Sequence, residues 1–321
     1  MWSPIRFTRP GARATDDTAK RYREVMPRAV ANKWETLPIE LEYDTFGDKS
    51  NPALVLIMGF GAQMVAWHTD FAQMLADRGH YVVRFDNRDV GLSTKLDGVD
   101  VDANAVVVAS LTEQPLPSVP YNLSDMAADV VGLMDHLGIP KAHILGASMG
   151  GMIAQVFAIE HPRRTASLIS VMSMPGEPET MESTPEAMTA LMSIPPSDRA
   201  GFIEHSLVYQ AFQSKKYRDA DLSRENAARD FDRSFYPQGS PRQLAAIYAS
   251  GRRTEALAAL KVPTLVLHGN DDTLIVPGAG KRTAEIIPNA QLVLIDDMGH
   301  DMPRQLWGQI VDTISRFTHK Q

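Results

Sequence analysis

Apolar and polar residues follow two spacings along most of the chain, and these spacings predict strands and helices in turn. Short apolar runs ended by glycine or polar turns predict buried strands over residues 53–58, 81–85, 142–145, 166–172, 264–267 and 292–295. Period-two alternation predicts a half-exposed strand over 39–43. Helical spacing predicts helices over 71–75, 149–160, 244–260, 280–287 and 305–317, and another from an N-cap at Ser124 to Gly138. This alternation indicates a mostly parallel sheet with helices on both faces.

Two segments depart from the alternation. Residues 1–36 are polar, and we interpret them as an N-terminal arm with one short helix around 17–26. Residues 174–240 are rich in Pro, Met, Glu and Arg, and they have short helical patterns without a strand pattern. The sequence therefore predicts an α/β core over 37–173 and 241–321, interrupted by a helical cap at 174–240.

The sequence Gly146-Ala147-Ser148-Met149-Gly150 lies between a predicted strand and a predicted helix. A serine in this context stands on a sharp turn, and a Cβ on either flanking glycine would collide with its neighbours. The turn exposes the hydroxyl, and the helix N-terminus behind it favours developing negative charge. Ser148 is therefore the predicted nucleophile; the alternative is a glycine-rich turn without chemistry.

A serine hydroxyl needs a base to become a strong nucleophile, and the base needs an acid to orient it. The loop after the strand at 292–295 carries His300 just before the last predicted helix, so we expect His300 to be the base. The other histidines lie on packing elements or precede the acid. The loop after the strand at 264–267 offers Asp271 and Asp272. Adjacent side chains point in different directions, so only one of them can serve.

Acyl transfer also needs donors for the oxyanion. The backbone N–H after the nucleophile, at Met149, is one expected donor. The second is the N–H of Phe60, because the glycines of the segment 58–61 let the backbone approach a substrate. A plain glycine turn is the alternative for this segment. The charged segment 86–93 resembles a second site, but we interpret it as a tight turn pinned by Arg88 and carboxylates.

Composition excludes several classes of function. The chain has 321 residues, no cysteine and a net charge of -7, so disulfides and thiolate sites are excluded and a nucleic-acid partner is disfavoured. No 18-residue apolar run and no signal-like N-terminus are present. No metal-ligand spacing or phosphate-binding loop appears, so no metal or cofactor is expected. We expect a soluble, cytoplasmic protein with a small-molecule substrate; the oligomeric state stays open, and a monomer is plausible.

Methionine is frequent, with 16 residues, and several lie beside the predicted site. Flexible thioethers suit a roomy apolar pocket, although core packing explains several of them equally well. Met64 and Met174 follow the loops of the site, and Met188 and Phe212 lie in the cap. We expect these four residues, together with Trp67, to contact the substrate.

These motifs together resemble the α/β-hydrolase superfamily over roughly residues 38–318. The resemblance rests on the serine turn, on His-Gly-x-x-Asp-x-x-x-x-Pro at 268–277, on Asp-x-Arg-x-x-Gly-x-Ser at 86–93 and on the pair Gly299-His300. It implies an eight-stranded, mostly parallel sheet with an inserted cap, and it assigns the acid to Asp272. Met58 departs from the pattern, because many members have histidine before the oxyanion glycine, and Asp89 replaces a frequent glycine.

Within this superfamily, the segments 58–61, 85–93 and 146–151, with Trp67, are similar to the branch that contains aclacinomycin methylesterase. Serine-dependent macrolide esterases look similar too. The resemblance implies a carboxylic ester or lactone hydrolase, with opening of a macrolide lactone as the best expectation. The alternatives are a small-molecule carboxylesterase, a polyketide methylesterase, or a ligand-binding protein without activity.

Overall fold

The computed structural model describes residues 27–180 and 182–321. Within this part of the chain the strands form one eight-stranded sheet, in the order β1-β2-β4-β3-β5-β6-β7-β8. The strands are β1 (Arg28–Trp34), β2 (Leu37–Phe46), β3 (Ala53–Ile57), β4 (Tyr81–Phe85), β5 (Ala142–Ala147), β6 (Thr165–Val171), β7 (Thr264–Gly269) and β8 (Gln291–Ile295). β2 pairs antiparallel with β1 and β4, and all the other pairs are parallel. The predicted sheet is therefore confirmed.

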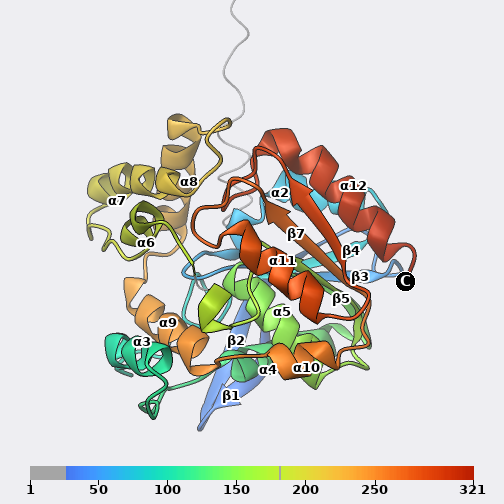
Figure 1. Cartoon of the computed structure of the whole chain (residues 1–321), viewed down its shortest axis with the longest axis horizontal. Coiled ribbons are helices and arrows are strands. Elements are labelled where there is room, and N and C mark those ends of the chain that lie inside the picture. The colour runs from blue at the N-terminus through green and yellow to red at the C-terminus, as the bar shows by residue number, and fades with distance from the viewer. Residues whose placement is uncertain (1–26, 181) are drawn as a thin grey trace, which may run out of the picture.

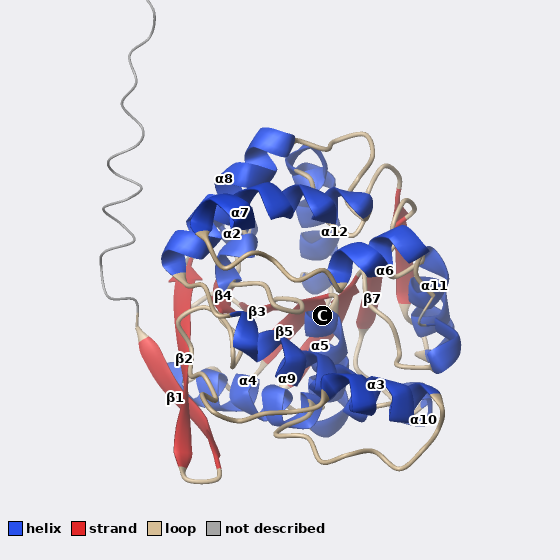
Figure 2. Ribbon diagram, turned by 90° about the vertical axis from the view of Figure 1, so that its left-hand side faces the viewer, coloured by secondary structure: helices blue, strands red, loops and turns tan. Residues whose placement is uncertain are grey.

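Helices cover both faces of the sheet (Figures 1 and 2). The α-helices outside the predicted cap are α2 (Thr69–Ala76), α3 (Ala103–Leu111), α4 (Leu123–Leu137), α5 (Met149–Glu160), α9 (Ser240–Ala249), α10 (Thr254–Ala258), α11 (Pro277–Ile286) and α12 (Trp307–Thr318). Short 3-10 turns add η1 (Met64–Ala66) and η5 (Arg304–Leu306). Helices α2 and α12 pack on one face, and α4, α5, α10 and α11 pack on the other.

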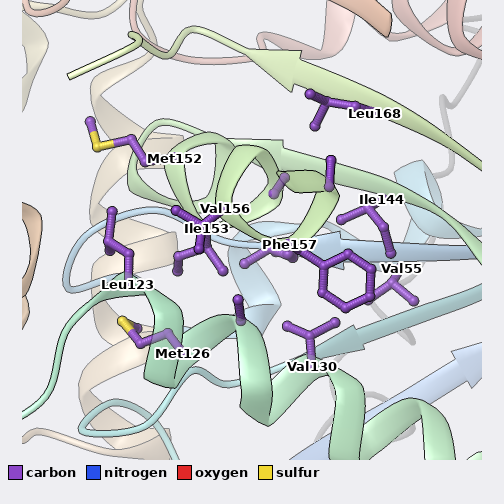
Figure 3. Packing of buried hydrophobic residues seen from close by; sticks show 14 of the residues in the cluster. Val55, Leu123, Met126, Val130, Ile144, Met152, Ile153, Val156, Phe157 and Leu168 are labelled. Atoms are coloured by element: carbon purple, nitrogen blue, oxygen red, sulfur yellow. The ribbon is translucent and has the colours of Figure 1, made fainter. Parts of the chain in front are cut away.

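The buried strands divide their side chains between two apolar clusters. Val55 and Ile57 of β3 belong to the cluster under α4 and α5, whereas Leu54 and Leu56 belong to the cluster under α2 and α12. Figure 3 shows Val55 packed in the first cluster with side chains of α4 and α5. Successive side chains of a strand point to opposite faces, so a strand covered on both faces must be apolar throughout. For this reason these strands appear in the sequence as continuous apolar runs.

The N-terminal segment differs from the prediction. Residues 28–34, expected at the end of a polar arm, form β1 and pair with β2 at the edge of the sheet. The pairing register shifts between Val30 and Asn32, so this bulged edge strand lacks regular alternation and gives no strand pattern. The expected helix at 17–26 lies outside the described residues.

Two helical predictions also need correction. The expected helix at 244–260 is broken into α9 and α10, where Gly251 adopts a positive φ of 56°. The N-cap of α4 is Asn122 rather than Ser124, because Asn122 and Asp125 form a reciprocal capping box. Helix α3 was not predicted; its apolar residues lie all around the helix and give no amphipathic pattern.

Between β6 and α9 the described residues form helices and turns without a strand. The elements are η2 (Pro178–Thr180), α6 (Pro185–Leu191), α7 (Arg199–His205), η3 (Ser206–Ala211), α8 (Ala220–Arg233) and η4 (Pro237–Gly239). Helices α7 and α8 lie side by side in both views (Figures 1 and 2). The helical content agrees with the expectation for residues 174–240, and we call these residues the cap below.

Candidate active site

Ser148 occupies a strained turn between β5 and α5. Its φ of 56° and ψ of -122° lie outside the regions that non-glycine residues favour. A Cβ at Gly146 would come within 1.9 Å of the carbonyl oxygen of Gly150, and one at Gly150 within 2.1 Å of the carbonyl oxygen of Ile57. The two glycines therefore let the serine turn fit between the sheet and the helix.

The nucleophile, base and acid expected from the sequence come together in one hydrogen-bonded chain. Nε2 of His300 lies 3.0 Å from Oγ of Ser148. Nδ1 of His300 lies 2.8 Å from Oδ2 of Asp272. A carboxylate can only accept, so in the neutral ring Nδ1 donates to Asp272 and Nε2 is left to accept the serine proton.

Asp272 is held as a buried anion. Burial alone would raise the pKa of Asp272, but the charge and hydrogen bonds of His300 and His268 lower it to about 2. The other oxygen, Oδ1, accepts the N–H groups of Leu274 and Ile275, both at 2.9 Å. These contacts fix the orientation of the carboxylate toward the base.

His268 is a second histidine on the acid, and the sequence did not assign it this place. Its Nε2 lies 2.7 Å from the carbonyl oxygen of Ile275 and 3.4 Å from Oδ2 of Asp272. Both partners accept, so Nε2 carries a proton directed between them. The signal that could have found it is its position four residues before the acid, at the end of a buried strand.

Asp271 does not take part in the chain. Its N–H donates to the carbonyl oxygen of Met298 at 3.0 Å, which fixes the backbone of this loop beside the base loop. Its carboxylate makes no hydrogen bond within residues 27–180 and 182–321. Of the two adjacent aspartates, only Asp272 contacts His300.

The segment 58–61 lies against the nucleophile. A Cβ at Gly59 would meet Cβ of Ser148 at 3.1 Å, so the backbone passes the serine in close contact. In the described chain the N–H groups of Phe60 and Met149 donate to no protein acceptor, whereas the next N–H, of Gly61, donates to Gln243. Both expected oxyanion donors are therefore available at this point.

The charged turn at 86–93 is structural, as expected. Arg88 forms a bidentate pair with Asp129, with both N–O distances at 2.6 Å. Asp86 accepts the N–H groups of Met64 at 2.7 Å and Leu92 at 2.8 Å. These buried contacts fix the turn beside the oxyanion segment.

The cap is hydrogen-bonded directly to the loop of the base. The N–H of His300 donates to the carbonyl oxygen of Phe212 at 2.7 Å, and the two rings meet edge to face at 6.0 Å. The N–H of Ser214 donates to Oδ1 of Asp301 at 2.8 Å. A Cβ at Gly299 would lie 2.7 Å from the same Phe212 oxygen, so only glycine permits this approach.

The cap also contacts the loop of the acid. The N–H of Thr184 donates to the carbonyl oxygen of Thr273 at 2.9 Å. The hydroxyl of Thr273 in turn donates to the carbonyl oxygen of Ala211 at 3.2 Å. The hydroxyl of Ser183 donates to the carbonyl oxygen of Leu274. Two separate cap segments therefore bind the loop that carries Asp272.

The remaining residues expected to contact the substrate lie in different surroundings. Trp67 and Met64 are fully buried, and the Trp67 ring stacks on Phe71 in the cluster under α2. Met174 is buried in the opposite cluster, and Met188 is partly exposed on α6. The described contacts thus bring Phe212 to His300 and place Trp67 in the core.

In residues 27–180 and 182–321, no helix is long and apolar enough to cross a membrane. Across the same ranges, no group of His, Asp and Glu side chains is arranged to hold a metal ion.

Known proteins resemble this chain along most of its length. It is 25% identical over 305 residues to the rhodomycin D methylesterase DauP of Streptomyces sp. strain C5, covering 87% of this chain and 93% of that protein. The rhodomycin D methylesterase DnrP of Streptomyces peucetius is 23% identical over 292 residues, covering 83% and 90%. The expected resemblance to the methylesterase branch is thereby confirmed.

Solved structures agree with the fold. The enol-lactonase of Burkholderia xenovorans LB400 superposes with a TM-score of 0.69 at 23% identity, covering 91% of this chain and all of that one. A thermophilic esterase of Thermogutta terrifontis gives a TM-score of 0.68 at 25% identity, covering 92% and 98%. Residues 52–303 match the family described as alpha/beta hydrolase fold. The chain belongs to the α/β-hydrolase family.

Proposed function

We propose that this protein hydrolyses carboxylic esters or lactones with Ser148 as nucleophile, His300 as base and Asp272 as acid. The observation that carries the proposal is the hydrogen-bonded chain of these side chains, with distances of 3.0 and 2.8 Å. The esterases and lactonase among the similar proteins support the same chemistry.

The reaction follows from the placement of the protons. His300 removes the Ser148 proton as Oγ attacks the carbonyl carbon, and the negative oxygen is held by the N–H groups of Phe60 and Met149. The intermediate collapses, and His300 donates the proton to the leaving alkoxide. Water, deprotonated by His300, then attacks the carbonyl carbon of the acyl-serine, and His300 returns the proton to Oγ of Ser148 as the carboxylic acid leaves.

For the substrate we propose a large, mostly apolar ester, with the lactone of a 16-membered macrolide as the leading candidate. The partly buried Phe212 and Met188 come from the cap, and burial of apolar surface stabilises bound ligand by about 25 cal/mol per Å² before ordering costs. The enol-lactonase in the fold comparison supports ring opening as chemistry that this fold accommodates.

A second candidate is the methyl ester of a polyketide, favoured by the similarity to the two rhodomycin D methylesterases. Mass spectrometry distinguishes the two products. Opening a lactone adds one water to the intact substrate, whereas cleaving a methyl ester releases methanol and shortens the substrate by a methylene. Short aryl esters test the third alternative, a general small-molecule carboxylesterase.

The central test is Ser148→Ala. We expect the variant to fold normally and to lose activity by roughly 10⁴-fold or more, because only binding and the oxyanion donors remain. A fluorophosphonate probe should label the wild type and not the variant. Retention of more than about a tenth of the wild-type rate would exclude Ser148 as nucleophile, since loss of a nucleophile costs far more. A wild type that the probe does not label would favour the ligand-binding alternative.

A further inference from the structure

Gln243 on α9 is a fully buried amide that joins two distant loops. Its Oε1 accepts the N–H of Gly61 at 2.9 Å, across 182 residues of sequence. Its Nε2 donates to the carbonyl oxygen of Arg88 at 2.9 Å. A buried amide is costly unless it is hydrogen-bonded, so this side chain occupies one defined orientation.

The bond to Gly61 fixes the peptide group that follows Phe60. The N–H of Gly61 belongs to the same plane as the carbonyl of Phe60, so holding this N–H sets the rotation of the whole plane. At the other end of the segment, Nδ2 of Asn87 donates to the carbonyl oxygen of Met58 at 2.9 Å. The N–H of Phe60 therefore lies between two fixed peptide groups.

Gly61 needs such support because it adopts a positive φ of 65°, a conformation that glycine leaves and enters at little cost. A Cβ at Gly61 would meet Oγ of Ser240 at 3.5 Å, so the first turn of α9 packs against the segment as well. The other partner of Gln243, Arg88, is itself fixed because its side chain is paired with Asp129. Gln243 thus connects the segment 58–61 to the buried turn that carries Arg88.

We propose that Gln243 is a positioning residue of the oxyanion hole, and this rests on the proposed function. It holds the segment 58–61 so that the N–H of Phe60 faces the tetrahedral intermediate formed at Ser148. It also occupies the N–H of Gly61, which would otherwise be a competing donor one residue away. Oxyanion donors accelerate the reaction only when they are oriented before charge develops, so a loosened segment lowers the rate of the chemical step.

The test compares Gln243→Met with Gln155→Met in the full-length chain. Methionine is close to glutamine in size and cannot accept and donate as the amide does. Gln155 is also fully buried, but its hydrogen bonds go to Ser170 and Arg253, away from the oxyanion segment. It therefore controls for the general effect of removing a buried amide.

With a short aryl acetate, we expect Gln243→Met to lower kcat by about 10- to 100-fold with KM changed less than about 3-fold, because the lost interaction acts mainly in the transition state. The dissociation constant of a trifluoromethyl ketone, whose adduct with Ser148 carries an oxyanion, should rise by the same factor. Gln155→Met should leave both constants near the wild-type values. If Gln243→Met does not fold, Gln243→Asn replaces it, because this shorter amide cannot span Gly61 and Arg88.

Wild-type kcat in Gln243→Met or in Gln243→Asn would overturn the inference. An equal loss of kcat in Gln155→Met would also overturn it, because the loss would then follow from core packing. Neither result would contradict the proposed roles of Ser148, His300 and Asp272, because Ser148→Ala tests the nucleophile independently. If the wild type fails to hydrolyse any ester, the proposed function fails first.

Discussion

The sheet core and the surface of the cap each hold an ion pair, and the two pairs differ in exposure. In the core, Arg88 and Asp129 form an ion pair whose side chains are 1% and 3% exposed. In the cap, Arg199 and Asp232 form a pair of similar geometry whose side chains are 52% and 55% exposed. Helix α7 of the cap buries none of its residues, whereas α5 of the core buries almost all of its residues. The Arg88–Asp129 pair is thus enclosed by packing, whereas the Arg199–Asp232 pair lies at the surface; another cap residue, Arg233, is buried against Asp86.

The largest difference should appear between two adjacent aspartates of the loop that follows β7. Asp272→Asn should lower kcat by roughly 10³- to 10⁴-fold, because asparagine favours the wrong tautomer of His300. Asp271→Asn is the matched control one residue away and should change kcat little. Steady-state kinetics of both variants decide the assignment, and the reverse ranking would transfer the role to Asp271.

The second test compares the two ion pairs. Arg88→Met should lower the free energy of unfolding by about 3–5 kcal/mol, because it leaves the carboxylate of Asp129 buried without a partner. Arg199→Met removes an exposed pair, which water and salt already weaken, and should leave the unfolding midpoint nearly unchanged. Urea unfolding measures both. Similar effects in the two variants would contradict the contrast between core and cap.

The free energy of unfolding should also depend on pH through a buried histidine of the core. Burial, with the nearby charges of His80, His319 and Lys141, lowers the pKa of His143 from its ordinary 6.5 to about 4. The unfolded chain therefore binds a proton at His143 more readily than the folded chain does. The contribution of neutral His143 to the free energy of unfolding is complete above about pH 6.5 and is lost as the pH falls toward about 4. Between pH 7.5 and 5, His143→Gln should lose about 2 kcal/mol less stability than the wild type. Equal losses by urea unfolding would exclude His143 as the source.

The smallest expected effect concerns the cap and the size of the substrate. Met188→Ala combined with Phe212→Ala removes apolar side chains from the cap and keeps the backbone carbonyl that holds His300. We expect kcat/KM for a macrolide lactone to fall by roughly 10-fold, from lost burial of about 1–2 kcal/mol, with a smaller change for a short aryl acetate. Equal losses for both substrates would indicate a disturbed triad, and an intact macrolide under excess wild type would refute the large-substrate proposal.

The sequence predicted best where local pattern and burial agree. The strand at 81–85 and the helix at 149–160 were placed with their actual bounds, since both are apolar runs ended by sharp turns. The serine turn carries its own signature, and the order of the later loops led to His300. The acid could not be chosen from spacing alone, because the orientation of adjacent side chains depends on the loop conformation.

Contacts between distant segments were not predictable in the same way. Nothing near Gln243 in the sequence marks it, because its partners Gly61 and Arg88 are far away in the chain. The sequence shows an aromatic residue, Trp67, after the segment 58–61 but not which way it points, and in the structure its ring is buried in the cluster under α2. Likewise, β1 pairs through its backbone, and backbone pairing leaves little trace in side-chain pattern.

The carbonyl oxygen of Phe212 has a consequence for protein engineering and for divergence within the family. It belongs to the cap, yet it accepts the N–H of His300, the proposed base. A cap transplanted from a relative to change the substrate range would bring its own backbone to this position. If that backbone ends a fraction of an ångström away, His300 loses its alignment although every catalytic side chain is still present. The junction at 211–214 therefore has to be kept with the triad when the cap is exchanged.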